Sequence, residues 1–185
     1  MARNDDTLGI FGGSFDPPHL AHVLVVAYVL SASHVNRVLV IPTFLHPFAK
    51  ELAPYPHRMK MCELAFADLR RVEVSGIEGT LGGESRTVRT IEALSKRNQA
   101  LRLILGSDLI EETSRWHRFD RISALAPPLV IPRASDTANN PFGIPGISST
   151  RIRERLRKGE TLHGLLPEPV LDYIERNDLY RNQMS

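Results

Sequence analysis

Two histidines, His19 and His22, stand behind a glycine-rich turn in the segment GIFGGSFDPPHLAHVL, residues 9–24. Residues three apart lie on one face of a helix, so both imidazoles are expected on the first turn of the helix that begins here. Gly12 and Gly13 would let a ligand approach the backbone, and the helix start adds amides and a positive dipole end. A capped helix with surface histidines is the alternative, but the combination favours a phosphate-binding turn.

A second segment with the same ligand chemistry lies far along the chain, at residues 146–159, GISSTRIRERLRKG. Ser148, Ser149 and Thr150 can cap a helix whose first amides are open, and the guanidinium of Arg153 follows at once. Hydroxyls, amides and guanidinium at a helix start suit a polyphosphate. The alternative is a well-capped basic surface helix. Because two distant segments favour the same ligand, we expect them to meet at one site.

Four single residues are weaker candidates. Asp108 follows a predicted strand and could accept hydrogen bonds from a ribose, reach the water shell of a metal ion, or only cap a helix. Lys50 and Arg133 are further phosphate ligands or plain surface charges. Trp116, the only tryptophan, offers a face for a flat aromatic ring, although a lone tryptophan is more often a core anchor.

Short apolar runs alternate with helical patterns, which predicts an α/β fold with an open parallel sheet and helices on both faces. The expected strands are Leu8–Phe11, Arg37–Ile41, Val72–Val74, Leu101–Leu105 and Leu129–Ile131, and the expected helices are Leu20–Ala32, Arg58–Leu69, Val88–Lys96, Ser149–Lys158 and Glu168–Asn177.

The clearest change of composition is Ala134–Gly146, rich in Pro, Gly, Asn and Ser, which predicts a loop or linker. We therefore divide the chain into a core over residues 1–133 and a second part over residues 134–185, made of the linker and a small C-terminal helical unit. A length of 185 residues suits this arrangement.

Composition narrows the classes of function. The net charge is only +2 with scattered basic residues, so no nucleic-acid partner is expected, and no segment approaches membrane-spanning length. Cys62 is the only cysteine, which excludes an intrachain disulfide and a cysteine metal site. The N-terminus carries acids where a secretory signal would be apolar. We expect a cytoplasmic protein, and the sequence is compatible with a homo-oligomer.

The motifs together resemble one family. GGSFDPPHLAH resembles the G-G-T/S-F-D-P-x-H-x-G-H signature of the nucleotidyltransferase superfamily, and ISSTRIR resembles its I-S-S-T-x-I-R signature. LRLILGSDLIEETSRWHRFDRISALAPPLVIPR and LLPEPVLDYIERNDLY are similar to the bacterial nicotinate-mononucleotide adenylyltransferases. The resemblance implies a Rossmann-like fold and transfer of AMP from ATP to a pyridine mononucleotide in NAD biosynthesis. It also implies Mg²⁺ bound through the ATP phosphates, with no metal held by the protein itself.

The resemblance further implies roles for the matching residues. His19 and His22 would be catalytic. The expected ATP-binding residues are Gly12, Gly13, Ser14, Phe15, His19, His22, Lys50, Gly106, Asp108, Arg133, Ser148, Ser149, Thr150 and Arg153. The expected acceptor-binding residues are Trp116, which would stack on the pyridine ring, with His117, Arg86, Thr87 and Arg89.

Three departures from the family pattern bear on the acceptor. Ala21 replaces the glycine before the second histidine, and the P-P-H-K segment reads LHPFAK, with His46 and Lys50. The S-Y-T-x-D-T segment reads SRTVRT, so Arg86 and Arg89 replace a tyrosine and an aspartate. Two cations in place of a ring and an acid would reshape an acceptor pocket.

Three functions therefore stay open at this stage. The first is adenylyl transfer to nicotinate mononucleotide. The second is the same chemistry on another phosphorylated acceptor, such as nicotinamide mononucleotide or phosphopantetheine; Trp116 and the ending YIERNDLY disfavour the latter. The third is a nucleotide-binding protein without turnover, which the intact histidines and ISST segment disfavour.

Overall fold

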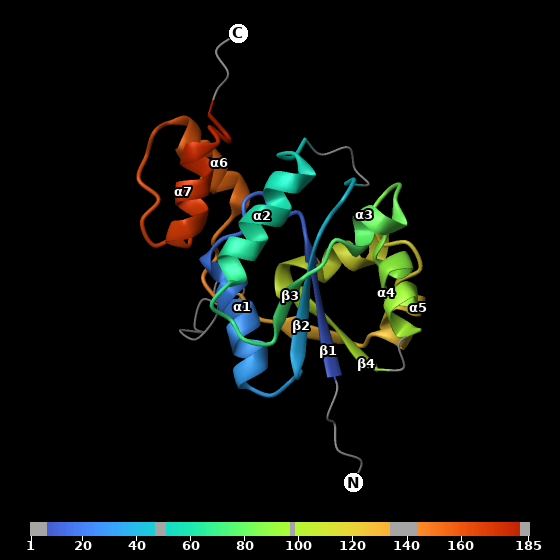
Figure 1. Cartoon of the computed structure of the whole chain (residues 1–185). Coiled ribbons are helices and arrows are strands. Elements are labelled where there is room, and N and C mark those ends of the chain that lie inside the picture. Colours follow the sequence, from blue (N-terminus) through green and yellow to red (C-terminus); the bar gives the residue numbers. More distant parts are fainter. Residues whose placement is uncertain (1–6, 47–50, 97–98, 134–143, 182–185) are drawn as a thin grey trace.

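The computed structural model describes residues 7–46, 51–96, 99–133 and 144–181. Its centre is a five-stranded parallel sheet in the order β3-β2-β1-β4-β5. The strands are β1 (Thr7–Gly13), β2 (Arg37–Pro42), β3 (Val72–Val74), β4 (Ala100–Gly106) and β5 (Pro128–Ile131). All five predicted strands and their parallel arrangement are confirmed. The fold is Rossmann-like, with helices between successive strands (Figure 1).

The helices are α1 (Leu20–Ser31), α2 (Tyr55–Phe66), α3 (Ile77–Leu81), α4 (Thr87–Ser95), α5 (Phe119–Leu125), α6 (Ser149–Arg157) and α7 (Glu168–Arg176), with short 3₁₀ turns η1 (Ser107–Leu109) and η2 (Glu111–Arg115). The five predicted helices are present. α2 begins three residues earlier than predicted, at Tyr55 instead of Arg58, because Pro54 and Pro56 favour the start of a helix. The sequence analysis missed α3 and α5, which are too short to show a helical period.

The sheet separates two apolar clusters, as strands buried on both faces require. Along β2, Val38 and Val40 enter one cluster with α1 and α2, whereas Leu39 and Ile41 enter the other with α4 and α5. Figure 1 shows α1 and α2 on one side of the sheet and α3, α4 and α5 on the other. The predicted coverage of both faces is therefore confirmed.

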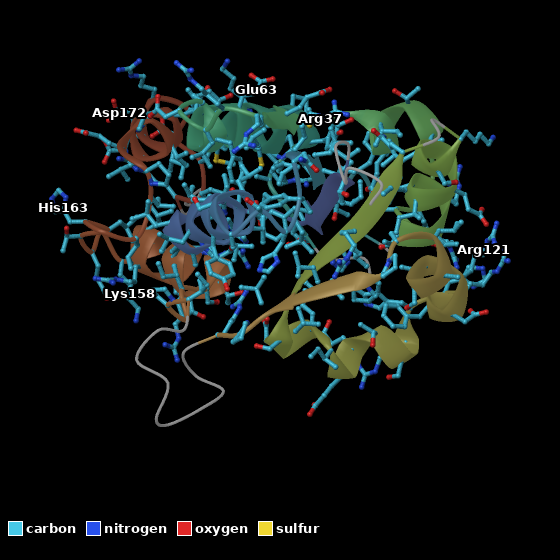
Figure 2. All side chains as sticks on the ribbon, turned by 90° about the horizontal axis from the view of Figure 1, so that it is seen from below. Arg37, Glu63, Arg121, Lys158, His163 and Asp172 are labelled. Atoms are coloured by element: carbon cyan, nitrogen blue, oxygen red, sulfur yellow. The ribbon has the colours of Figure 1, made fainter. Side chains whose placement is uncertain are left out.

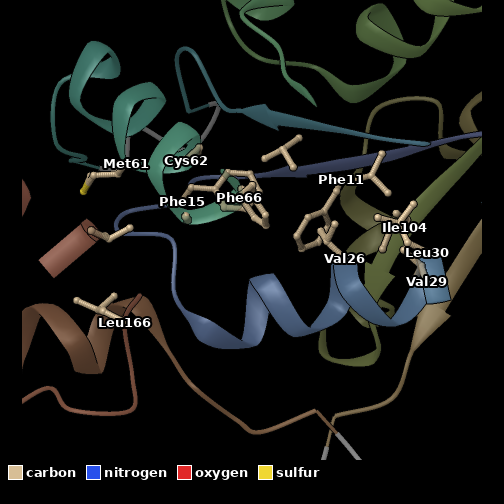
Figure 3. Packing of buried hydrophobic residues seen from close by; sticks show 14 of the residues in the cluster. Phe11, Phe15, Val26, Val29, Leu30, Met61, Cys62, Phe66, Ile104 and Leu166 are labelled. Carbon is tan, nitrogen blue, oxygen red and sulfur yellow. The ribbon is translucent and has the colours of Figure 1, made fainter. Parts of the chain in front are cut away.

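The C-terminal helices α6 and α7 pack beside α1 and α2 (Figure 1). Ile152, Leu166 and Ile174 are buried in the same cluster as Phe15 of the loop between β1 and α1. Figure 3 shows Leu166 and Phe15 among the side chains of this cluster. The C-terminal unit therefore shares its core with the sheet. Most of the predicted linker, residues 134–143, lies outside the described residues, and a division of the chain at residue 133 stays a prediction.

The surface carries the charged side chains, such as Arg121, Lys158 and Asp172, which surround the sheet and helices in Figure 2. No helix in the described part of the chain combines the length and the apolar character needed to cross a membrane.

Candidate active site

The strand order reverses between β1 and β4, and in open α/β sheets this is the place where a crevice forms at the carboxyl ends of the strands. A cavity of about 740 Å³ lies there, lined by Gly12 and Gly13 of β1 and by Leu105 and Gly106 of β4. Its volume is in the range of small-molecule and cofactor sites. A Cβ built on Gly12 would meet no protein atom nearer than Ile41 O at 4.0 Å, so a ligand can approach this backbone.

Most of the predicted site residues line this single cavity, although they come from five separate parts of the chain. The predicted residues on its wall are Gly12, Gly13, Ser14, Phe15, His19, His22, Arg86, Thr87, Gly106, Asp108, Trp116, His117, Arg133, Ser148, Ser149, Thr150 and Arg153. Arg89 is not on the wall, and Lys50 lies outside the described residues. The fold therefore brings the two predicted phosphate-binding segments, residues 9–24 and 146–159, to the same cavity, as their shared chemistry predicts.

The two histidines form a stacked pair. The rings of His19 and His22 lie 3.6 Å apart at 18°, and the ring of Phe15 meets His22 edge-on at 4.9 Å. The backbone N–H of His19 donates to Nδ1 of His22 at 3.1 Å. In a neutral His22 the proton therefore stands on Nε2, which can donate to a ligand.

Both imidazoles are neutral in the free protein. Burial, and then the nearby Arg133, lower the pKa of His19 to about 3. The pKa of His22 is also lowered well below its ordinary value, by burial and then by His19 and Arg133. The pair can thus supply N–H donors to a phosphate without bringing a fixed positive charge. Arginine supplies the charge in this site.

The start of α6 joins the turn that precedes α1. Ser149 Oγ donates to Pro17 O at 2.9 Å, and Arg153 Nη1 donates to Asp16 O at 2.6 Å. Ser148 is the N-cap residue, as predicted, but no side-chain hydrogen bond caps the helix. The prediction that the hydroxyls of Ser148, Ser149 and Thr150 can cap this helix is therefore wrong, and the Ser149 hydroxyl instead joins the two segments.

The start of α1 differs from the expectation of open amides. The His19 amide donates to His22, and the Leu20 amide donates to Leu165 O of the C-terminal unit at 3.0 Å. These two donors are therefore used within the protein. Both histidines, Gly12 and Gly13 still line the cavity, together with Ser14 and Phe15.

Asp108 and Arg133 form an ion pair at the end of β4, with Nε and Oδ1 3.0 Å apart. A Cβ on Gly106 would collide with Asp108 Oδ1, so this position requires glycine for the carboxylate to lie against the strand end. The N-cap of η1 is Gly106, and Asp108 therefore does not cap this turn. The Arg133 amide also donates to Ser107 Oγ at 3.0 Å.

The part of the cavity wall that holds Trp116, His117 and Arg86 is less enclosed. The Trp116 ring is half-buried and meets Phe119 edge-on at 6.0 Å and 88°. Arg86 pairs with Glu84 at 3.0 Å, and both side chains are about half exposed, at 44% and 56%. Arg89 instead donates to the carbonyls of Leu81 and Gly82 at 3.0 and 2.9 Å, at the end of α3. The two arginines of SRTVRT therefore have different surroundings.

The sequence analysis gave no role to Arg58, which is 2% exposed. Its guanidinium donates to Ser14 O at 3.0 Å and Thr43 O at 2.7 Å, and Nε donates to Ala53 O at 2.8 Å. Arg58 thus holds the two loops that follow β1 and β2. The sequence signal for this role was that Arg58 begins the helical pattern RMKMCELAF, residues 58–66, whose other core-facing residues are apolar.

Comparison with known proteins identifies the family of the chain. The family model described as cytidylyltransferase-like matches residues 10–155. A relative from Anaeromyxobacter dehalogenans is 43% identical over 180 residues, which cover 94% of this chain and 96% of the relative. A relative from Myxococcus xanthus is 35% identical over 178 residues and 94% of both chains. Both carry the name "Probable nicotinate-nucleotide adenylyltransferase".

The fold is also found among solved structures. The nicotinic acid mononucleotide adenylyltransferase of Plasmodium falciparum, solved in complex with NaAD, has a TM-score of 0.84 to this chain at 20% identity. The match covers 95% of this chain and 97% of the Plasmodium chain. The sheet, the crevice and the two motifs thus define a nucleotidyltransferase of the cytidylyltransferase-like class. Within that class, the chain belongs to the nicotinate-nucleotide adenylyltransferase family.

Proposed function

We propose that this protein transfers the adenylyl group of ATP to nicotinate mononucleotide, giving nicotinate adenine dinucleotide and pyrophosphate. One observation carries the proposal. Residues 12–22 and 148–153, far apart in the sequence, line one cavity in a chain that is 43% identical to a relative of that name over nearly its whole length. Two phosphate-binding segments in one cavity suit a substrate with a long phosphate chain.

The reaction needs positioning and neutralisation of charge more than acid–base chemistry. An oxygen of the acceptor 5′-phosphate attacks the α-phosphorus of ATP, a new P–O bond forms, and the bond to the bridging oxygen of the β-phosphate breaks. The acceptor phosphate is already ionised at neutral pH, so no general base is required. Pyrophosphate leaves with the electron pair of the broken bond.

We assign the groups by their place in the cavity. His19 and His22 donate N–H bonds to the oxygens of the reacting phosphate, where negative charge grows in the transition state. Arg153 and the hydroxyls of Ser148 and Thr150 receive the β- and γ-phosphates. In the free protein, the lowered pKa of both histidines keeps these donors neutral.

We propose that Mg²⁺ binds through the β- and γ-phosphates of ATP, because phosphate oxygens and waters are the ligands that this ion prefers. Asp108, on the cavity wall, is the carboxylate that could meet its water shell or a ribose hydroxyl. The ion pair with Arg133 leaves one of its two carboxylate oxygens for such a contact.

We assign the acceptor to the less enclosed part of the cavity, which holds Trp116, His117 and Arg86. Trp116 offers a half-buried aromatic face for the pyridine ring. The Trp116 amide donates to Thr113 O at 3.0 Å, so we assign the nicotinate carboxylate to the next amide, at His117, with Arg86 adding positive potential. The NH₂ group of a carboxamide is itself a donor and could not accept a hydrogen bond from this amide. The site therefore favours nicotinate mononucleotide over the amide form.

The test is an acceptor panel. Purified protein with MgATP is given nicotinate mononucleotide, nicotinamide mononucleotide or phosphopantetheine, and release of pyrophosphate is followed. We expect the highest kcat/KM with nicotinate mononucleotide. A higher kcat/KM with the amide would overturn the choice of acid. Turnover with phosphopantetheine alone would indicate adenylyl transfer to another phosphorylated acceptor. Binding of ATP without release of pyrophosphate would indicate a nucleotide-binding protein without turnover.

The cytoplasmic location and the absence of nucleic-acid and membrane partners stay predictions that fit these substrates. A homo-oligomer also stays open.

A further inference from the structure

Asp16 is a buried acid, 1% exposed, that lines the cavity and bonds to the turn that follows α7. Its Oδ1 accepts from the hydroxyl of Tyr180 at 2.7 Å and from the amide of Ala53 at 3.0 Å. Its Oδ2 lies 3.4 Å from Nη1 of Arg153. The same Nη1 donates to the backbone carbonyl of Asp16 at 2.6 Å. Asp16 thus connects three segments that are distant in the sequence.

Tyr180 reaches Asp16 because the chain reverses direction after α7. Asp178 and Tyr180 both have left-handed backbone conformations, with φ of 49° and 65°, and the Leu179 amide donates to Ile174 O at 3.1 Å. The Tyr180 ring packs against the apolar cluster of α1 and α2. Burial, and then Asp16, raise the pKa of the hydroxyl far above its ordinary value, so it stays a donor.

The arrangement makes Tyr180 and Arg153 share one carboxylate. While the hydroxyl and the Ala53 amide occupy Oδ1, Arg153 meets Oδ2 and the backbone carbonyl through a single nitrogen. Arg153 lines the cavity, and its second nitrogen, Nη2, donates to Thr150 Oγ1 at 3.4 Å and not to Asp16. If the hydroxyl were removed, the carboxylate could turn and take both nitrogens of Arg153 in a two-bond pair.

We propose that Tyr180 is a positioning residue for ATP, which acts through Asp16 to keep part of the Arg153 guanidinium available to the β- and γ-phosphates. The inference rests on the proposed function, in which Arg153 receives these phosphates. It gives the last turn of the chain, 164 residues from Asp16 in sequence, a part in nucleotide affinity.

The variant Tyr180→Phe removes only the hydroxyl and keeps the ring in the core. We expect the Kd for ATP, measured by calorimetry, and the KM for ATP to rise roughly three- to tenfold, the scale of one hydrogen bond. The Kd for AMP, which lacks the β- and γ-phosphates, and the KM for the acceptor should stay within twofold. A partly unfolded variant would weaken ATP and AMP equally, so the ratio of the two Kd values isolates the positioning effect.

Tyr173→Phe is the matched control, because it removes a hydroxyl from the same C-terminal unit. Tyr173 Oη bonds to His57 Nδ1 at 2.9 Å and is not a partner of Asp16. This variant should keep the ATP-to-AMP ratio of the wild type. An equal change of the ratio in both variants would reduce the role of Tyr180 to general support of the fold.

The decisive arm is the double variant Tyr180→Phe with Arg153→Ala. If Tyr180 acts through Arg153, its effect on ATP affinity disappears in the Arg153→Ala background. An additive loss would overturn the inference, as would wild-type ATP affinity in Tyr180→Phe alone. A wild type that binds no ATP at all would instead overturn the proposed function. The two failures are therefore distinguishable.

Discussion

The part of the cavity that we propose for the nucleotide and the part that we propose for the acceptor, here called the nucleotide end and the acceptor end, are built in different ways. At the nucleotide end, Asp16 and His19 are almost completely buried, and Arg153 is held through Asp16 and Thr150. At the acceptor end, Arg86 and Glu84 form an ion pair whose side chains are about half exposed. Buried, bonded groups are fixed before the ligand arrives, whereas exposed pairs adjust at small cost.

This contrast separates the chemistry from the choice of acceptor. Adenylyl transfer depends on donors that are already in place when charge moves from the α-phosphorus to the leaving group. In the proposed function, the choice of acceptor depends on Trp116 and Arg86, which lie outside the buried cluster of α1 and α2. We therefore expect substitutions at the nucleotide end to have large effects on turnover and those at the acceptor end to have smaller, selective ones.

The largest effect is expected at His22. His22→Ala removes one preorganised N–H donor to the reacting phosphate, and kcat should fall roughly 10²–10³-fold. The variant should bind ATP and show the circular-dichroism spectrum of the wild type, because only the ring is lost. Steady-state release of pyrophosphate measures the change. A kcat within threefold of the wild type would remove His22 from the catalytic role.

The second effect concerns stability at acid pH. The pKa of His19 is lowered in the folded protein from 6.5 to about 3, so the unfolded chain binds the proton more readily. The stability contributed by neutral His19 is therefore present above pH 6.5 and is lost as pH falls from there toward 3. Between pH 7 and 4.5 this loss should be about 2–3 kcal/mol, measured by urea unfolding.

The variant His19→Gln should lose that part of the pH dependence, because glutamine does not titrate. His163→Gln is the control, since His163 lies exposed at the edge of the C-terminal unit (Figure 2). Equal slopes of stability against pH in His19→Gln and the wild type would contradict the burial of a neutral His19.

The third effect separates the phosphates of ATP. Arg153→Ala removes a charge-assisted contact to the β- and γ-phosphates, so ATP binding should weaken by about 1.5–3 kcal/mol. AMP should bind nearly as it does to the wild type. Calorimetry with both nucleotides measures the difference. If AMP binding falls as much as ATP binding, Arg153 acts mainly by holding Asp16.

It could be predicted that His19, His22, Ser148 and Arg153 share one cavity, because these residues lie in two continuous segments at the start of α1 and of α6. A short segment at a strand end or helix start largely determines where its own side chains lie. All five strands were predicted for the related reason that short apolar runs are a local signal. These predictions needed no knowledge of long-range contacts.

Long-range contacts account for what the sequence did not predict. The bond of Tyr180 to Asp16 and the bonds of Arg58 to Ser14 and Thr43 depend on how distant segments pack. Arg86 and Arg89 appeared equivalent because both replace family residues within one motif. The helical turn of α4 directs Arg89 toward the end of α3, while Arg86, at the N-cap, stays on the cavity wall.

The fourth effect is a selective loss of acceptor binding. Trp116→Ala removes the aromatic face proposed for the pyridine ring, and the acceptor KM should rise about tenfold, the scale of one stacked ring pair. The Kd for ATP should stay within twofold. Trp116→Phe keeps an aromatic face and should recover part of the loss. A matching loss of ATP affinity in Trp116→Ala would mean that the tryptophan supports the whole cavity.

The smallest effect is expected for the two arginines of SRTVRT, which form a matched pair. Arg86→Gln removes a charge from the cavity wall, so the preference for the acid over the amide mononucleotide should fall about two- to fivefold, the scale of an exposed charge. Arg89→Gln removes donors to Leu81 O and Gly82 O outside the cavity, so Tm should fall by about 2–4 °C with the preference unchanged. Thermal scans and kcat/KM for both acceptors measure the pair. The opposite pattern would be a loss of acid preference in Arg89→Gln and a lower Tm only in Arg86→Gln. That result would place the acceptor site near α3 and not near Arg86. Because both changes remove one charge from one short segment, only the direction of each side chain can produce the difference.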